Sequence, residues 1–211
     1  MIKQTLYPKT KRVSCNGDLV TITEKIDGSN LCIFKHNDEL YIAQRNNIIN
    51  VDKELEESKK LVYKGLYQWL MDHKEFLKEE LHEGSVICGE WIGMGCLKYS
   101  VDEFDKRFYM FAKANVSTEN DTIELTNLNY EHSLFIYPFA SQTIPSFIGT
   151  VPFVKEMNVI PTKEHLDSVY IKYCETVGRN VEGFVVSYKN IISKYVRMKN
   201  GQLREHFDRG E

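Results

Sequence analysis

The sequence lacks the features that mark membrane proteins and secreted proteins. In its 211 residues no run approaches the roughly 18 consecutive apolar residues that a membrane-spanning helix needs. The opening segment, MIKQTLYPKTKRV, has no apolar stretch of the kind found in secretory signal peptides. The sequence therefore predicts a soluble, cytoplasmic protein without a membrane partner.

Cysteine and histidine are too scattered to form a recognisable metal or disulfide motif. The five cysteines are an odd number, no two of them form a C-x-x-C pair, and no histidine cluster lies near them. This pattern argues against a structural zinc site and a disulfide framework, so reduced thiols are expected. The six histidines are equally dispersed, which argues against a histidine-based catalytic site.

A surplus of basic residues is also missing. The 27 Lys and Arg stand against 30 Asp and Glu, which gives a formal net charge of −3. This balance argues against a protein that coats nucleic acid non-specifically, but it allows an enzyme with one local basic groove. The composition, with 42% hydrophobic and 27% charged residues, is typical of a globular chain with its own core.

The hydrophobic pattern predicts an α+β fold built on antiparallel sheets, because helices do not alternate regularly with strands. Strands are expected at 19–23, 31–34, 40–44, 85–91 and 107–112, with a hairpin formed by 181–188 and 191–198. Helices are expected at 52–81, with Asp52 as the N-cap and Gly65 as a point of division, and at 162–175. The segment 116–161 is mixed and is broken by several prolines.

The segment Glu24–Asn30, with the sequence EKIDGSN, places a lysine where a strand passes into a tight turn. Lysine is a nucleophile only when neutral, so burial or nearby cations must lower its pKa. The turn residues would hold its amine beside a ligand. By itself, however, the pattern K-x-D-G favours a β-turn with an exposed lysine next to it.

Other charged residues stand in apolar strands. Glu90 lies in GEWIG and Glu182 begins EGFVV, while Arg197 and Lys199 are expected on one face of the last strand. Burying an isolated charge is costly, so each should meet a partner or a ligand. Each also has a simpler interpretation, in which the two glutamates pair with the two cations as core salt bridges.

In chain order, these segments resemble the motifs of the covalent nucleotidyltransferase superfamily, which comprises ATP-dependent DNA ligases, RNA ligases and mRNA-capping guanylyltransferases. The resemblance extends from about Thr21 to Asn200 and implies two antiparallel sheets with flanking helices, the nucleotidyltransferase (ATP-grasp-like) adenylation domain. The matching segments are Lys25–Gly28 (motif I), Cys88–Trp91 (III), Phe108–Phe111 (IIIa), Glu182–Val185 (IV) and Arg197–Lys199 (V).

Within the superfamily, the chain is most similar to phage RNA ligase 2-like enzymes, whose first motif reads E-K-x-[HD]-G-[ST]-N. The segment Ala43–Asn46 also resembles the next motif of that family. DNA ligases usually have K-x-D-G-x-R, and Asn30 stands here in place of that arginine. An ATP-dependent RNA ligase is therefore expected, with a DNA ligase-like adenylyltransferase as one alternative and a non-catalytic module that binds nucleotides or nucleic-acid ends as another.

The resemblance implies that Lys25 attacks the α-phosphorus of ATP and holds AMP as a phosphoramidate. AMP then passes to the 5′-phosphate of an RNA end, in a nicked duplex or a single strand, and a 3′-hydroxyl attacks that activated end. Glu182 is implied to bind Mg²⁺ or Mn²⁺ or to orient Lys25. The residues implied to bind the nucleotide are Glu24, Ile26, Asp27, Gly28, Asn30, Arg45, Glu90, Phe111, Glu182, Arg197 and Lys199.

Three features depart from the family pattern. The first cation of motif V is usually a lysine and here is Arg197, and an aspartate usually follows the aromatic residue of motif IIIa, where this chain has Ala112. Beyond Lys199, 12 residues remain, too few for an OB domain or a helical domain. Residues 1–211 are therefore expected to form a single adenylation domain, which either seals RNA alone or needs a partner protein.

Overall fold

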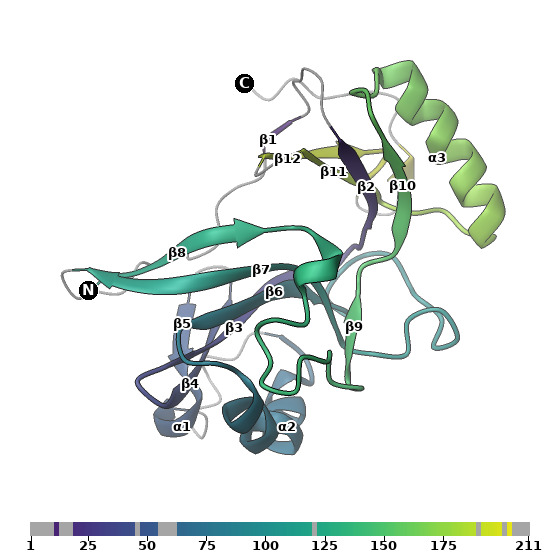
Figure 1. Ribbon diagram of the computed structural model, residues 1–211. Helices are drawn as coiled ribbons and strands as arrows, with labels where there is room; N and C mark the ends of the chain where they lie inside the picture. Colours follow the sequence, from purple (N-terminus) through teal and green to yellow (C-terminus); the bar gives the residue numbers. More distant parts are fainter. Residues whose placement is uncertain are drawn as a thin grey trace. The chain divides into compact units, whose positions relative to one another are not determined.

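The computed structural model describes residues 11–12, 19–44, 47–54, 63–119, 122–188, 191–199 and 202–203 (Figure 1). The chain divides into two compact units. Unit 1 is built mainly from Gly28–Met94 and Ser100–Thr150, and unit 2 mainly from Lys9–Asp27, Gly95–Tyr99 and Val151–Glu211. In the described part of the chain, no helix is long and apolar enough to cross a membrane.

Unit 1 contains a seven-stranded sheet with the order β5-β4-β3-β6-β7-β8, and β9 pairs with β7. All of its strand pairs are antiparallel except β7 with β9. The strands are β3 (Ser29–His36), β4 (Glu39–Gln44), β5 (Asn47–Asn50), β6 (Ser85–Trp91), β7 (Phe108–Glu119), β8 (Thr122–Asn129) and β9 (Ile148–Thr150). A 3₁₀ turn, η2 (His132–Leu134), follows β8.

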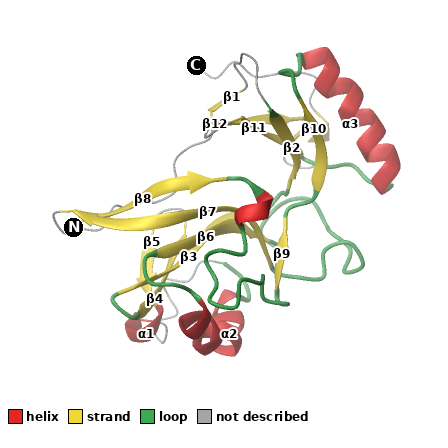
Figure 2. Ribbon diagram, in the orientation of Figure 1, coloured by secondary structure: helices red, strands yellow, loops and turns green. Residues whose placement is uncertain are grey.

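One face of this sheet packs against helix α2 (Leu66–Glu80) (Figure 2). Leu31 and Ile33 of β3 share a buried core with Trp69 and Leu70 of the helix. Gly65 precedes the helix with φ of 81°, a left-handed conformation that glycine adopts without a steric penalty. The sequence analysis expected the helical tract 52–81 to divide at Gly65, and α2 does begin directly after Gly65. Residues 55–62 of that tract lie outside the described residues.

The prediction that Asp52 caps a helix was wrong. The short helix α1 (Val51–Glu54) begins one residue earlier, and the Oδ1 of Asn50 accepts hydrogen bonds from the backbone N–H groups of Asp52 and Lys53, at 3.0 and 3.1 Å. Asn50 therefore has the capping position. The carboxylate of Asp52 instead accepts the N–H of Leu40 at 2.9 Å, which connects the helix to β4.

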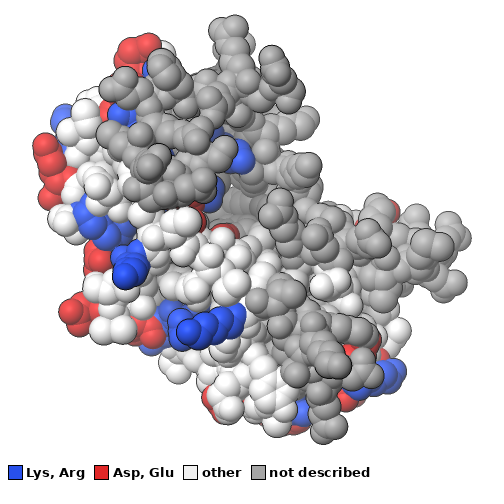
Figure 3. Space-filling model, turned by 180° about the vertical axis from the view of Figure 1, so that it is seen from behind, with Lys and Arg blue, Asp and Glu red and all other residues white. Residues whose placement is uncertain are grey.

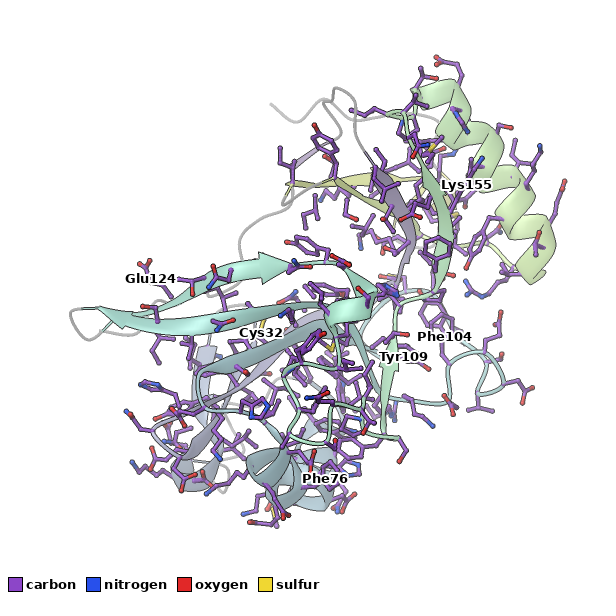
Figure 4. All side chains as sticks on the ribbon, in the orientation of Figure 1. Cys32, Phe76, Phe104, Tyr109, Glu124 and Lys155 are labelled. Carbon is purple, nitrogen blue, oxygen red and sulfur yellow. The ribbon has the colours of Figure 1, made fainter. Side chains whose placement is uncertain are left out.

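The opposite face of the seven-stranded sheet carries a second cluster of side chains, which includes Cys32, Cys88 and Ala112. Cys32, labelled in Figure 4, lies opposite Cys88 on the neighbouring strand, and their Sγ atoms are 2.8 Å apart. Both are free thiols, and burial raises the pKa of Cys88 well above its ordinary value. Two buried thiols therefore lie side by side on this face.

Unit 2 contains a five-stranded sheet with the order β1-β12-β11-β2-β10. Its strands pair antiparallel except β1 with β12. The strands are β1 (Lys11–Arg12), β2 (Val20–Lys25), β10 (Phe153–Met157), β11 (Gly183–Tyr188) and β12 (Ile191–Val196). Beyond them, β13 (Met198–Lys199) and β14 (Gln202–Leu203) form a separate two-stranded ladder.

Helix α3 (Lys163–Val177) covers one face of the five-stranded sheet. Ile22, Phe184 and Tyr195, from three adjacent strands, pack against Leu166 and Tyr170 of the helix. The side-chain oxygen of the N-cap, Thr162, accepts the N–H of His165, and Gly178 ends the helix in a left-handed conformation. The expected helix at 162–175 is confirmed.

The predicted fold class is confirmed, because two mainly antiparallel sheets with few helices make up the described chain. The hairpin of β11 and β12 is also confirmed. The segment 116–161 contains three strands that the sequence analysis did not identify, β8, β9 and β10.

Candidate active site

Lys25 and Glu182 meet in unit 2. Lys25 ends β2, Glu182 immediately precedes β11, and the strand register places Lys25 opposite Gly183. The Nζ of Lys25 donates a hydrogen bond to Oε2 of Glu182 at 2.6 Å, and the two side chains are 24% and 17% exposed. An amine and a carboxylate that are 157 residues apart in sequence thus share one largely buried position.

Burial raises the pKa of the Glu182 carboxyl group above its ordinary value, although the charge and hydrogen bond of Lys25 act in the opposite direction. The charge of Asp27 raises this pKa further, and the charge of Lys194 lowers it. A carboxylate with a raised pKa binds a proton more readily. Glu182 can therefore both orient the amine of Lys25 and accept a proton from it.

Replacing Lys25 by methionine is expected to make the stability of the protein depend more strongly on pH. In this variant burial still raises the pKa of Glu182, but the lowering effect of Lys25 is lost. A carboxyl group with a raised pKa in the folded state gives stability that is present below its unfolded pKa and is lost as the pH rises through the folded pKa. Each additional unit of pKa difference corresponds to about 1.4 kcal/mol.

Urea unfolding of the wild type and of Lys25→Met, from about pH 4.5 to neutral pH, measures this effect. The free energy of unfolding should fall more steeply with rising pH in the variant. The double variant Lys25→Met/Glu182→Gln is the control, because it lacks the titrating carboxyl group and should lose the added slope. Identical pH profiles for the wild type and the single variant would contradict the assigned coupling.

Arg197 lies between β12 and β13, so the prediction of one continuous last strand that carries both Arg197 and Lys199 was wrong. The backbone N–H groups of Arg197 and Met198 both donate to the carbonyl oxygen of Glu182, at 2.9 Å each, which interrupts the alternation of the strand. The Nη1 of Arg197 donates to Oδ1 of Asp167 on α3 at 2.7 Å. Its backbone therefore lies at Glu182 while its guanidinium group pairs with the helix.

Two other expected site residues cannot be placed as side chains. Arg45 and the side chain of Lys199 lie outside the described residues. The backbone of Lys199 is in β13, opposite Gln202 of β14. Their implied contacts with the nucleotide stay predictions.

Lys194 is a cation near this site that the sequence analysis missed. It lies opposite Val185, which in turn lies opposite Thr23, so these three residues share one face of the five-stranded sheet. Lys25 is two residues beyond Thr23 and belongs to the same face, the one opposite α3. The charge of Lys194 also lowers the pKa of Glu182. Its position as a single charge in a mainly apolar strand was the signal in the sequence.

Glu24 and Asp27 lie on either side of the Lys25–Ile26 pair, and their carboxylates accept hydrogen bonds from other segments of unit 2. The carboxylate of Glu24 is buried and binds Arg179 and Tyr173. Ile26 is 2% exposed, and Asp27 Oδ2 accepts backbone N–H groups from residues 96 and 97 at 2.6 and 2.7 Å. Both carboxylates therefore have structural partners, and their implied contacts with a nucleotide stay predictions.

In unit 1, three candidate residues share one face of the seven-stranded sheet. Asn30 and Glu90 are direct cross-strand partners in β3 and β6. Phe111 lies at a β-bulge in β7, and its side chain packs with the cluster on the face opposite α2. Gly28 lies close to the end of β6, since a β-carbon added to it would come within 2.5 Å of the carbonyl oxygen of Trp91. The structure thus places Asn30, Glu90 and Phe111 on one face of three adjacent strands, with Gly28 in the turn before β3.

Glu182 is the only residue that the sequence analysis assigned to a metal. Among the described residues, no group of three or more His, Cys, Asp or Glu is arranged to hold a metal ion. Mg²⁺ usually binds proteins through one or two carboxylates together with substrate phosphates and water. A single, partly exposed carboxylate such as Glu182 fits that manner of binding.

The chain belongs to the RNA ligase family, because the model of that family matches residues 18–199. No match was found among curated protein sequences.

Solved RNA ligase structures share the fold at low sequence identity. An apo mutant of the Naegleria gruberi RNA ligase superposes with a TM-score of 0.54 at 15% identity, over 91% of this chain and 56% of that chain. An archaeal ATP-dependent RNA ligase gives a TM-score of 0.52 at 17% identity, over 90% of this chain and 48% of that chain. A further Naegleria gruberi mutant, with ATP and manganese, gives 0.52 at 14% identity over 91% and 56%. The chain thus spans about half the length of these ligases.

Proposed function

We propose that this chain is the adenylation domain of an ATP-dependent RNA ligase, which attaches AMP to Lys25 and passes it to the 5′-phosphate of an RNA end. The observation that carries the proposal is the contact of 2.6 Å between Lys25 and Glu182, inside the region matched by the family model. Two structural relatives support the choice of nucleotide, since one is described as ATP-dependent and another holds ATP with manganese.

In the first step, the neutral amine of Lys25 attacks the α-phosphorus of ATP. A nitrogen–phosphorus bond forms, the bond between the α-phosphorus and the bridging oxygen breaks, and pyrophosphate leaves. Glu182 holds the amine through its Oε2 atom and takes the proton that the amine loses. Its raised pKa favours that transfer.

Cations stabilise the negative charge that develops on the α-phosphate. Lys194, on the same sheet face as Lys25, is one of them, and the family resemblance assigns the same role to Lys199. The resemblance assigns it to Arg197 as well, but in this structure the guanidinium group of Arg197 pairs with Asp167 of α3. A divalent ion bound at Glu182 together with the phosphates would neutralise further charge.

The residues of unit 1 have their own assignments. We assign to Glu90 a hydrogen bond from the ribose and to Phe111 stacking on the adenine ring. Asn30 and Arg45 are assigned to the later steps, in which AMP activates the 5′-phosphate and a 3′-hydroxyl attacks it. Gly28 leaves no room for a side chain beside β6, which keeps this turn close to the strand.

RNA contacts must come from local basic groups, because the formal net charge is −3. On the face shown in Figure 3, Lys and Arg side chains lie among Asp and Glu over the described surface. We assign residues 1–211 to one adenylation domain, and self-adenylation needs this domain alone.

Incubation with α-labelled ATP and Mg²⁺ or Mn²⁺, followed by a denaturing gel, tests the proposal. The expected result is a covalent label on the protein with ATP, and transfer of that label to RNA with a 5′-phosphate. Label with GTP only would indicate a capping-type enzyme, and transfer only to DNA would indicate a DNA ligase. No label with either nucleotide would favour a non-catalytic module of the same fold.

Lys194→Met is expected to lower the rate constant of protein labelling about tenfold, because a cation is lost from the face that carries Lys25. Thermal stability should change little. The matched control is Lys155→Met, which removes an exposed lysine of the same sheet on β10 (Figure 4). An unchanged rate in Lys194→Met, at saturating ATP, would contradict the assignment of Lys194 to phosphate binding.

A further inference from the structure

The carboxylate of Glu24 is the centre of a buried group of polar side chains that the sequence analysis did not foresee. Its side chain is fully buried, with no exposed area. Arg179 binds it with two parallel hydrogen bonds, from Nη1 to Oε1 at 2.8 Å and from Nη2 to Oε2 at 2.9 Å. The hydroxyl of Tyr173 donates to Oε2 at 2.9 Å. A charge this deeply buried is retained only when it is well paired, as this one is.

The backbone places Arg179 for this role. Helix α3 ends at Gly178, whose φ of 70° turns the chain out of the helix, and Arg179 is the next residue. Its guanidinium group also lies over the ring of Tyr99, 5.4 Å from the ring centroid, in a cation–π contact. Arg179 thus joins the end of α3, strand β2 and the segment 95–99 within unit 2.

A second set of hydrogen bonds runs from Tyr99 to the other side of the lysine. The backbone N–H of Asp27 donates to the Tyr99 hydroxyl at 2.6 Å. The carboxylate of Asp27 accepts the N–H groups of Cys96 and Leu97, so the turn after Lys25 is held to the segment that carries Tyr99. Burial raises the pKa of the Tyr99 hydroxyl, which therefore stays protonated at neutral pH.

Arg179 is therefore connected to both residues that flank the Lys25–Ile26 pair, Glu24 and Asp27. It binds Glu24 directly, and it holds the ring whose hydroxyl binds Asp27. Glu24 and Lys25 are consecutive in β2, so their side chains point to opposite faces of the sheet. When the carboxylate of Glu24 is held on the α3 face, strand β2 is held as well, and the amine of Lys25 projects from the other face of that strand.

We propose that Arg179 is a positioning residue for the formation of lysyl-AMP, acting through Glu24 and Tyr99 on the backbone around Lys25. This inference rests on the proposed function, since it needs Lys25 to be the nucleophile. Arg179 lies outside the motifs that point to a nucleotidyltransferase, and its role follows from the two parallel hydrogen bonds and the ring contact.

The test is a single-turnover measurement of protein labelling at saturating α-labelled ATP, which gives both a rate constant and an end-point. Arg179→Met is expected to lower the rate constant on the order of 100-fold with an unchanged end-point, because a mispositioned nucleophile reacts slowly in every molecule. A purely structural role would lower the end-point instead, because part of the protein would be unfolded. The control is Lys172→Met, which removes an exposed lysine of α3 and should match the wild type in both quantities.

Two milder variants keep the proposal testable if Arg179→Met does not fold. Arg179→Lys retains the charge but loses the paired hydrogen bonds, and Tyr99→Phe retains the ring but loses the hydroxyl that binds Asp27. Both should lower the rate constant about tenfold at an unchanged end-point.

Wild-type rate constants in Arg179→Lys and Tyr99→Phe would overturn the positioning role, and so would losses confined to the end-point. Absence of label in the wild type itself is a different result, because it would refute the proposed function rather than this inference.

Discussion

Replacing Lys25 by methionine is expected to abolish the transfer of AMP from ATP to the protein. Methionine has a similar length but no amine, so no nitrogen–phosphorus bond can form. Removal of a covalent nucleophile typically lowers turnover by several orders of magnitude, and we expect a loss of on the order of 10³-fold or more. The measurement is the amount of labelled protein after incubation with α-labelled ATP and Mg²⁺.

Lys25→Arg sharpens this prediction. Arginine keeps the positive charge and can pair with Glu182, but it remains protonated at all accessible pH values and is not a nucleophile. It should therefore be as inactive as the methionine variant while keeping more of the wild-type stability. Lys155→Met serves as the control for loss of a lysine from the same sheet. Wild-type labelling of either Lys25 variant would show that another residue carries AMP.

The second large effect is expected from Gly183→Ala. Gly183 lies between Lys25 on β2 and Val196 on β12 in the strand register, and a β-carbon there would overlap the carbonyl oxygen of Tyr195. That atom belongs to the backbone of the adjacent strand, so relief requires the two strands to move apart. We expect the free energy of unfolding to fall by about 3 kcal/mol.

Gly178→Ala is the matched control for this variant. Gly178 also has a positive φ, of 70°, but a β-carbon there would meet no atom within 4 Å. Only the conformational penalty remains, about 1 kcal/mol. Urea unfolding of both variants separates steric overlap from backbone strain. Equal losses in the two variants would show that the close packing of Gly183 against Tyr195 contributes nothing.

The sequence predicted those parts of the fold and site that depend on local patterns. The strand that carries Lys25, the tight turn after it, and the later hairpin all follow from runs of β-branched residues bounded by turn residues. The contact between Lys25 and Glu182 was expected from the order of the family motifs along the chain, and not from the residues next to either one. Family membership followed in the same way, from residues spread over the whole chain.

Features that depend on irregular backbone could not be predicted in this way. Strand alternation placed Arg197 and Lys199 on one face, but two consecutive N–H groups share the carbonyl oxygen of Glu182 and interrupt the strand. The bulge at Phe111 has a similar effect in unit 1, because Met110 and Ala112 face opposite cores. A period of two residues fails wherever one extra residue enters a strand.

Other features were missed because they depend on contacts between segments that are far apart in the sequence. Arg179 follows a helix and matches no motif, and only the fold brings it to the buried carboxylate of Glu24. The strand β10 has a mostly exposed face at the sheet edge, including Phe153, so it has no alternating pattern to detect. Asn50 has the capping position in place of Asp52, and both are good capping residues. In each case the deciding contact comes from another part of the chain or from the local backbone conformation.

The proposed reaction leaves AMP bound to the amine of Lys25. The most direct measurement is peptide mass spectrometry of the protein after incubation with ATP and Mg²⁺, with fragmentation that locates the modified side chain. We expect one AMP on the peptide that contains Lys25. It should be removed by pyrophosphate, which reverses the step, and it should be absent from Lys25→Met. AMP on a different residue, or no AMP on a folded protein saturated with ATP and metal, would contradict the proposed reaction.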